Sequence, residues 1–173
     1  IRSHGVTEEV IDCAEKLGVQ MVDATCPFVA KIHKIVKDAS LKGETVLIAG
    51  DESHKEVIGI MGHTHGPVYV FYDEGSLEKL LQKHKNFEGI SLCVVSQTTF
   101  NEEIWKKCEK ILKKYCTNPS IFGTICNATS MRQSESADLS QKCDAMVVIG
   151  GRHSSNTRKL YDVCKENCEN TQQ

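Results

Sequence analysis

Short apolar runs of strand length alternate along this chain with longer amphipathic segments of helical pattern. The clearest run is residues 45–49, and comparable runs occupy residues 67–72, 90–95 and 145–149. Two parallel strands need a crossover between them, usually a helix, so this alternation is typical of parallel α/β architecture. We therefore predict an α/β fold that is built from repeated small parallel sheets.

Cap and turn residues set the expected bounds of these elements. Thr7 predicts the start of a helix that ends near Leu17, and Pro27 fits the first turn of a second helix that ends near Leu41. Residues 50–66 are polar and rich in glycine, which predicts a connection between strands. The other expected helices cover residues 76–84, 101–115, 130–143 and 154–168. Besides the four apolar runs named above, we expect strands at residues 20–24 and 120–125.

Charge and hydropathy exclude two classes of partner. The net charge is -2 and no long basic run occurs, so the sequence gives no electrostatic reason to bind nucleic acid. No apolar stretch approaches the roughly 20 residues that a membrane-spanning helix needs. We expect a soluble protein of the cytoplasm, or of the plastid stroma if the source is a plant or an alga.

Nine cysteines, an odd number, make a disulfide framework a poor default. Seven of them lie within helical or apolar patterns, where a reduced cysteine acts as a small hydrophobic residue. These seven are Cys13, Cys93, Cys108, Cys116, Cys143, Cys164 and Cys168. We expect them to serve as packing residues.

Cys26 and Cys126 have a different setting, because each follows an expected strand and precedes a helix. The positive end of a helix dipole stabilises a thiolate, which favours metal ligation or nucleophilic attack. No Cys-x-x-Cys pair occurs here to indicate zinc, and two widely separated thiols suit a cluster gathered from several domains. The recurrence of strand, cysteine and helix also predicts domain boundaries at these residues, which gives segments 1–25, 26–125 and 126–173.

Polar side chains follow several expected strands, at the sheet edge where α/β folds place ligands. His54 and Glu56 could deliver protons after the strand at residues 45–49, or belong to a solvated loop. Small polar side chains at residues 96–99 and 154–156 could cradle phosphate oxygens, or act as ordinary helix caps.

Three further histidines stand beside glycines. His4, which precedes Gly5, could add a donor to a phosphate cradle or could be a simple turn residue. His63 and His65 have the spacing of a metal pair, but we expect them to be mainly surface residues.

Six motifs in this order resemble the 4-hydroxy-3-methylbut-2-enyl diphosphate reductase family, also called the LytB or IspH family. They are Ser3–Val6, Asp23–Pro27, His54–Gly59, Ser96–Thr99, Thr124–Thr129 with Arg132 and Gln133, and Ser154–Asn156. The resemblance extends from residue 1 to about residue 165, and the number and order of the motifs make it specific.

The resemblance implies three similar α/β domains with pseudo-threefold symmetry around a [4Fe–4S] cluster. Cys26 and Cys126 would be two of its three cysteine ligands, and the third belongs to a Gly-Phe-Cys-type motif that this chain lacks. A C-terminal serine of the family's diphosphate pocket is missing too. We therefore expect an internal fragment, inactive alone, with the end of a first domain (1–25), a complete middle domain (26–125) and the first half of a third (126–173).

The implied reaction is reductive dehydroxylation of an allylic diphosphate to isopentenyl and dimethylallyl diphosphates. Glu56 would supply protons, with His54 and Thr98 relaying or positioning them, and ferredoxin or flavodoxin would supply electrons. The residues that would bind the diphosphate are His4, His54, Thr98, Ser154, Ser155 and Asn156.

Two other interpretations remain open. The chain could be a phosphate-binding α/β module without redox chemistry, or an interaction domain whose cysteines are merely buried. Sheet edges left unpaired by truncation could also promote self-association.

Overall fold

The computed structural model describes residues 1–151 and 153–173. Contacts divide the chain into two compact units, of which the first holds residues 1–97 and 104–124 and the second holds residues 98–103 and 125–173. The predicted boundaries at residues 26 and 126 concern a different, three-domain division, and they stay a prediction.

A four-stranded parallel sheet forms the centre of the first unit, with the strand order β2-β1-β3-β4. The strands are β1 (Thr45–Ala49), β2 (Val68–Phe71), β3 (Leu92–Ser96) and β4 (Ser120–Ile121). Every residue of the two central strands, β1 and β3, is buried, as expected for parallel strands covered on both faces. The predicted α/β class is therefore confirmed.

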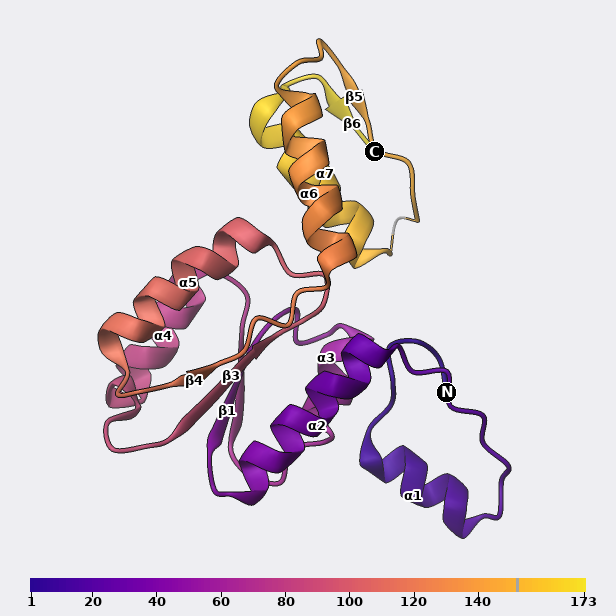
Figure 1. Ribbon diagram of the computed structural model, residues 1–173, viewed down its shortest axis with the longest axis vertical. Helices are drawn as coiled ribbons and strands as arrows, with labels where there is room; N and C mark the ends of the chain where they lie inside the picture. The colour runs from indigo at the N-terminus through magenta and orange to yellow at the C-terminus, as the bar shows by residue number, and fades with distance from the viewer. Residues whose placement is uncertain (152) are drawn as a thin grey trace. The chain divides into compact units, whose positions relative to one another are not determined.

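Helices cover both faces of this sheet, with α2 and α3 on one side and α4 and α5 on the other (Figure 1). The helices of this part are α1 (Glu8–Lys16), α2 (Pro27–Leu41), α3 (Lys55–Met61), α4 (Glu74–Lys83), the short 3-10 helix η1 (Lys85–Phe87) and α5 (Glu102–Tyr115). Ile32 and Val36 of α2 pack with Val46, Ile48 and Val57 in the core. This packing fixes α2 and α3 firmly against the sheet.

Strong local signals predicted several of these elements correctly. The bounds of α2 and β1 match the expected residues 27–41 and 45–49. Thr7 caps α1, because its hydroxyl accepts a hydrogen bond from the backbone N–H of Val10. Where apolar periodicity and cap residues agree, they are sufficient to predict the bounds of an element.

The strand expected at residues 20–24 is wrong. Ala24 N–H donates to the carbonyl of Ile1 and the Ile1 amino group bonds to the carbonyl of Val22, but no ladder forms. Val22 is 76% exposed, so its side chain has no sheet face to join. The apolar residues of this segment, taken alone, therefore predicted a strand that does not form.

The glycine-rich connection expected over residues 50–66 contains a helix, α3, that the sequence did not reveal. Its residues Val57 and Ile60 are fully buried in the core. Gly59 lowers the helical propensity of this short segment, and tertiary packing overrides that cost. The expectation of a solvated loop around His54 and Glu56 is also wrong, because Glu56 is buried.

The second unit is a small helix pair with a minimal sheet. Helices α6 (Asn127–Ser140) and α7 (Ser155–Asn167) pack together, and β5 (Met146–Val147) pairs in parallel with β6 (Thr171–Gln172). The expected strand at residues 145–149 is thus shorter than predicted, and Ile149 is 93% exposed. Strand β6 was not predicted, since its polar residues carry no strand signal.

Most of the packing cysteines lie where the sequence predicts, and every cysteine is free. The buried ones are Cys93, Cys108, Cys116, Cys164 and Cys168. Burial raises the pKa of Cys93 and of Cys108 to about 12, so both thiols are protonated and inert at neutral pH. The prediction is wrong for Cys13, which lies on a helix that buries no residue, and for Cys143, which lies beyond the end of α6; both are exposed.

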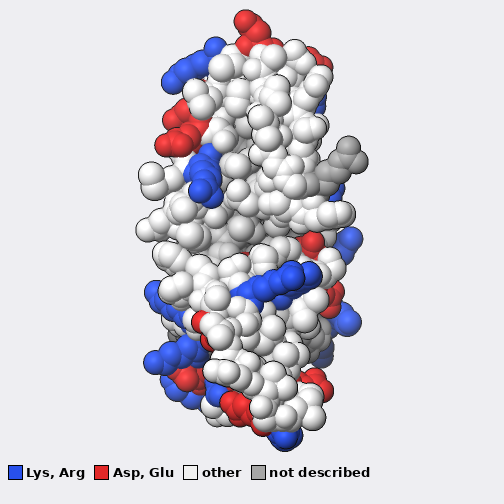
Figure 2. Space-filling model, turned by 90° about the vertical axis from the view of Figure 1, so that its right-hand side faces the viewer, with Lys and Arg blue, Asp and Glu red and all other residues white. Residues whose placement is uncertain are grey.

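Basic and acidic side chains are interspersed over the face of the molecule in Figure 2. No extended patch of one charge sign covers that face. None of the described helices combines the length and the apolar character that a bilayer crossing needs.

Candidate functional site

Two histidines meet at the carboxyl edge of β1. His54 lies in the connection that follows this strand and is the N-cap residue of α3, while His4 comes from the turn before α1. The ring centroids are 5.3 Å apart and the rings are nearly perpendicular. Two imidazoles at a sheet edge beside a helix N-terminus are suited to bind an anion.

The cap hydrogen bond orients His54. Its Nδ1 accepts from the backbone N–H of Glu56 at 3.2 Å, so the neutral ring carries its proton on Nε2. Burial lowers the pKa of His54, and the charge of Glu56 opposes that shift. In this tautomer the neutral imidazole has an Nε2–H that can donate to a phosphate oxygen or pass on a proton.

Glu56 lies in the first turn of α3 and is only 2% exposed. A carboxylate in this position faces the positive end of the helix dipole. Among the described residues, Glu56 is the buried acidic side chain two positions after His54, which makes it a candidate for proton exchange with that histidine. Sequence analysis identified the residue but not its burial.

Cys26 is tied to the turn that carries His4. Its backbone N–H donates to the carbonyl of Ser3 at 3.0 Å, and the residue is the N-cap of α2. The thiol is half-buried, free, and makes no capping hydrogen bond. The first unit thus gathers Cys26, His4, His54 and Glu56 on adjoining segments.

The second unit gathers the remaining candidates. Cys126 is the N-cap of α6, again with a free, half-buried thiol that makes no capping bond. Its backbone N–H donates to the carbonyl of Thr98 at 3.0 Å. The hydroxyls of Thr99 and Ser155 are 3.1 Å apart, which links the segment after β3 to the start of α7.

The start of α7 combines a cap with an unused acceptor. Ser154 Oγ accepts from the backbone N–H of Thr157 at 3.3 Å, so this side chain is an N-cap as one interpretation of the sequence predicts. The side-chain oxygen of Asn156 is buried and has no hydrogen-bond partner among the described residues. Buried polar atoms are normally paired, so Asn156 is suited to a ligand contact.

Cys26 and Cys126 individually fit the role of thiolate ligands of an iron–sulfur cluster. Both thiols are free and partly exposed at helix N-termini. Within the described part of the chain, no three His, Cys, Asp or Glu side chains form a set that could hold a metal ion. A complete ligand set therefore needs a donor beyond these two thiols.

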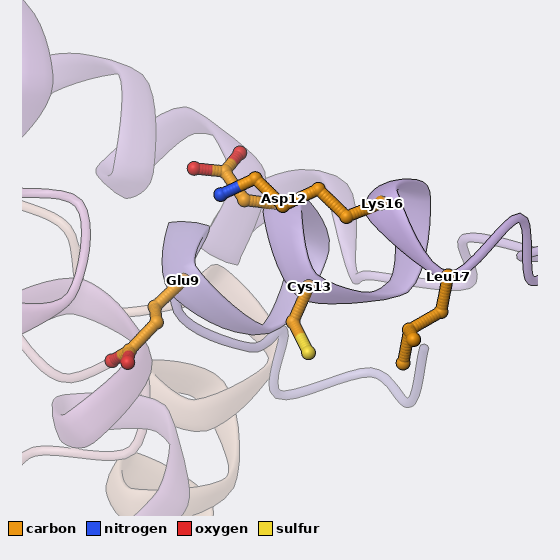
Figure 3. A pocket seen from close by; sticks show the side chains of 5 residues that line it. All are labelled: Glu9, Asp12, Cys13, Lys16 and Leu17. Atoms are coloured by element: carbon orange, nitrogen blue, oxygen red, sulfur yellow. The ribbon is translucent and has the colours of Figure 1, made fainter.

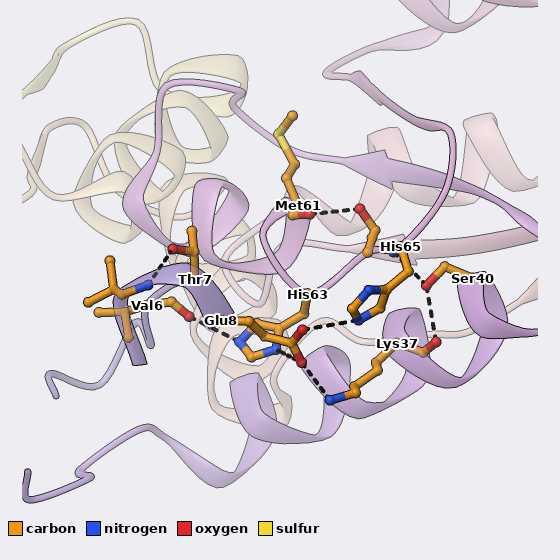
Figure 4. A network of polar contacts seen from close by, with 10 residues as sticks. Val6, Thr7, Glu8, Lys37, Ser40, Met61, His63 and His65 are labelled. Atoms are coloured by element: carbon orange, nitrogen blue, oxygen red, sulfur yellow. Dashed lines mark hydrogen bonds and ion pairs between the residues drawn. The ribbon is translucent and has the colours of Figure 1, made fainter. Parts of the chain in front are cut away.

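A second polar cluster was missed by the sequence and is shown in Figure 4. Glu8 bonds to Lys37 at 2.6 Å and to the ring nitrogens of His63 and His65 at 3.3 and 3.0 Å. His63 is only 9% exposed, so the expectation that it is a surface residue is wrong. The His-x-His spacing was visible in the sequence, but its partner Glu8 lies too far away along the chain to be paired with it.

A shallow hollow on the surface of α1 contains none of the candidate site residues. It is lined by Glu9, Asp12, Cys13, Lys16 and Leu17, all from this helix and its C-cap (Figure 3). An open hollow formed by one helix lacks the convergent polar groups of a ligand site.

Sequence relatives match nearly the whole length of this chain. A reductase from Thermoanaerobacter sp. is 43% identical over 171 residues, which cover 99% of this chain and 57% of that protein. A relative from Clostridium acetobutylicum is 44% identical, over 99% of this chain and 26% of its own length. Both are named 4-hydroxy-3-methylbut-2-enyl diphosphate reductase.

Two solved structures are also similar. One, of an (E)-4-hydroxy-3-methyl-but-2-enyl diphosphate reductase, has a TM-score of 0.67 and 35% identity, with 99% of this chain and 60% of that chain covered. The other, of the Plasmodium falciparum reductase, has a TM-score of 0.85 and 28% identity, with 96% and 52% covered. The chain thus spans 52% to 60% of the length of these structures. A family model described as "LytB protein" matches residues 1–173, and this chain belongs to the LytB family.

Proposed function

We propose that this chain is part of a 4-hydroxy-3-methylbut-2-enyl diphosphate reductase, which converts an allylic diphosphate into isopentenyl and dimethylallyl diphosphates. The observation that carries the proposal is the His4–His54 pair beside the buried Glu56, on segments adjoining Cys26. This arrangement combines anion donors, a proton source and a free thiol. The named relatives support the same activity.

The diphosphate would be bound by uncharged donors and helix N-termini. His4 and the Nε2–H of His54 donate to phosphate oxygens, and the N-terminus of α3 adds a favourable dipole. Thr98, Ser154, Ser155 and Asn156 complete the set of diphosphate ligands from the second unit.

Cys26 and Cys126 would hold a [4Fe–4S] cluster, together with a third thiolate from outside this chain. The cluster, when bound, supplies single electrons from ferredoxin or flavodoxin and a Lewis-acidic iron for the substrate oxygen. Both cysteines lie at helix N-termini, where the helix dipole favours a negatively charged group such as a thiolate-bound cluster.

Protons reach the substrate through this chain's own residues. Replacement of the hydroxyl by hydrogen consumes two electrons and two protons and releases water. Glu56 would deliver protons from its buried position, and His54 and Thr98 would relay or position them. Because its pKa is lowered by burial, His54 is neutral near pH 7, and the proton on Nε2 is the one that it can pass on. The place of action would be the cytoplasm, or the plastid stroma in a plant or an alga.

Anaerobic iron–sulfur reconstitution tests this proposal, with visible absorption and EPR as readouts. It is carried out on this chain and on a version extended at both ends to the length of the relatives. We expect a stable cluster and reductase activity only in the extended protein, and loss of both in the Cys26→Ser and Cys126→Ser variants. Cys13→Ser, which removes an exposed thiol, is the matched control.

Absence of a cluster from both versions would contradict the reductase. The phosphate-binding module would then be the better interpretation, and calorimetric binding of inorganic diphosphate would test it.

A further inference from the structure

His33 is a buried imidazole that the proposed chemistry does not use. It lies in α2, about two helical turns after Cys26, and it is 8% exposed. Its neighbours Ile32 and Val36 pack into the core. The ring of His33 instead faces the segments that carry the two site histidines.

Gly5 lets the His4 turn approach the His33 ring closely, and Gly59 of α3 lies beside the same ring. A Cβ atom on Gly5 would lie 2.4 Å from Cε1 of His33, and Gly5 has a φ of +70° that side chains rarely adopt. A Cβ atom on Gly59 would lie 3.5 Å from Nε2 of the same ring and 3.4 Å from the carbonyl oxygen of His4. The ring therefore lies beside both the His4 turn and the Gly59 position of α3.

The other face of the ring is supported by a second imidazole. His33 stacks on His63 with centroids 4.0 Å apart, and Nε2 of His63 donates to the carbonyl of Val6 at 3.0 Å. Burial and the neighbouring His63 lower the pKa of His33 to about 4. Nε2 of His33 has no hydrogen-bond partner among the described residues. His33 is thus a neutral ring, and it affects the neighbouring segments through steric contact rather than through charge.

The elements on either side of this ring carry the histidine pair. The turn holds His4, and α3 begins at His54, whose ring centroid is 5.3 Å from that of His4. We infer that His33 is a positioning residue, whose ring sets the spacing between the His4 turn and α3 and thereby the geometry of the His4–His54 anion site. The diphosphate nature of the anion rests on the proposed function.

The chain itself allows a direct test by NMR of ¹⁵N-labelled histidine rings. His33→Ala should shift the ring resonances of both His4 and His54. His84→Ala is the matched control, because it removes an imidazole that is also stacked and also has a buried Nε2 without a partner, but packs on Phe87. His33→Gln, a smaller change in volume, should give the same shifts with lower amplitude and serves if the alanine variant fails to fold. Folded His33 variants with unmoved His4 and His54 resonances would overturn the inference.

Kinetics of the extended, reconstituted protein add a second readout. His33→Ala should raise KM for the allylic diphosphate about tenfold and also lower kcat, because His54 both binds the anion and relays protons in the proposed function. His84→Ala should change neither constant. An inactive protein in every version would contradict the proposed function, while the NMR shifts would still decide the role of His33. If the NMR resonances of His4 and His54 shift in the His33 variants but KM is unchanged, the proposed link between His33 and substrate binding is overturned.

Discussion

At the scale of single residues, one carboxylate fastens the start of α1 to the rest of the first unit. Glu8 bonds to Lys37, His63 and His65, and these contacts come from α2 and from the segment after α3. The hydrogen bond from Lys37 is the main reason that the pKa of Glu8 is lowered. A lowered pKa in the folded state means that the charged form stabilises the fold.

Replacing Glu8 should therefore have a pH-dependent effect. The contribution of the carboxylate is present above the unfolded-state pKa of about 4.3 and is lost as the pH falls through the lower folded-state pKa. We expect Glu8→Gln to lower the free energy of unfolding by about 1 kcal/mol at neutral pH, a value kept small by partial exposure. Urea unfolding at neutral pH and near pH 3 measures this.

Glu9→Gln is the control for this substitution, because Glu9 is exposed on the same first turn. An equal destabilisation by Glu8→Gln at both pH values would show that lost packing, not charge, is responsible.

The coupling of His54 to Glu56 gives a second prediction at this scale. Burial lowers the pKa of His54 and the charge of Glu56 raises it, so Glu56→Gln should lower the pKa of His54 further. An NMR titration of the His54 ring measures the midpoint. Glu52→Gln, at an exposed position in the same connection, should leave it unchanged. A higher midpoint in Glu56→Gln would contradict this electrostatic description.

At the scale of elements, the contact between α3 and the cap of α1 depends on a glycine. A Cβ atom on Gly62, the C-cap residue of α3, would lie 2.3 Å from Cβ of Thr7. The backbone of Gly62 has a φ of -71°, which any residue adopts, so only the collision matters. Gly62→Ala should destabilise the protein by about 1–3 kcal/mol through overpacking, as thermal unfolding would measure.

Gly66→Ala is the matched control for this collision. No atom other than those of its chain neighbours lies nearer than 3.9 Å to a Cβ at that position. Similar losses in both variants would mean that the space around Thr7 is not the cause.

The same elements show what local sequence could predict. Helix α2 and strand β1 were predicted with their bounds, because Pro27 and the apolar run at residues 45–49 are strong local signals. Helix α3 was missed because it is only seven residues long and contains Gly59. Its stability comes from Val57 and Ile60 in the core, which is a tertiary effect that local propensity cannot reveal.

The candidate site was predicted to a similar extent. The positions of His54 and Thr98 after strands were visible in the alternating pattern, as were the cysteines at helix starts. The burial of Glu56 and the packing of His33 against Gly5 depend on contacts distant in sequence, and no periodicity encodes them.

At the scale of the whole molecule, the sheet of the first unit has two edge strands, β2 and β4. An unpaired edge is a template for pairing with another chain, which motivates the proposal that this chain self-associates. Light scattering coupled to size-exclusion chromatography should show a dimer whose fraction grows with concentration. A monomer at every concentration would reject the proposal.

The attachment of α1 has a mechanical consequence. This helix buries none of its residues. Glu8 at its N-terminal end bonds to Lys37 and, through its backbone N–H, to the carbonyl of Gly62, which lies next to Thr7. None of its side chains belongs to the buried core of the sheet, so we expect α1 to open locally at lower free energy than the sheet. In hydrogen exchange, the amides of α1 should lose their protons long before those of β1 and β3, and a protease should cut first in the exposed stretch at residues 18–24.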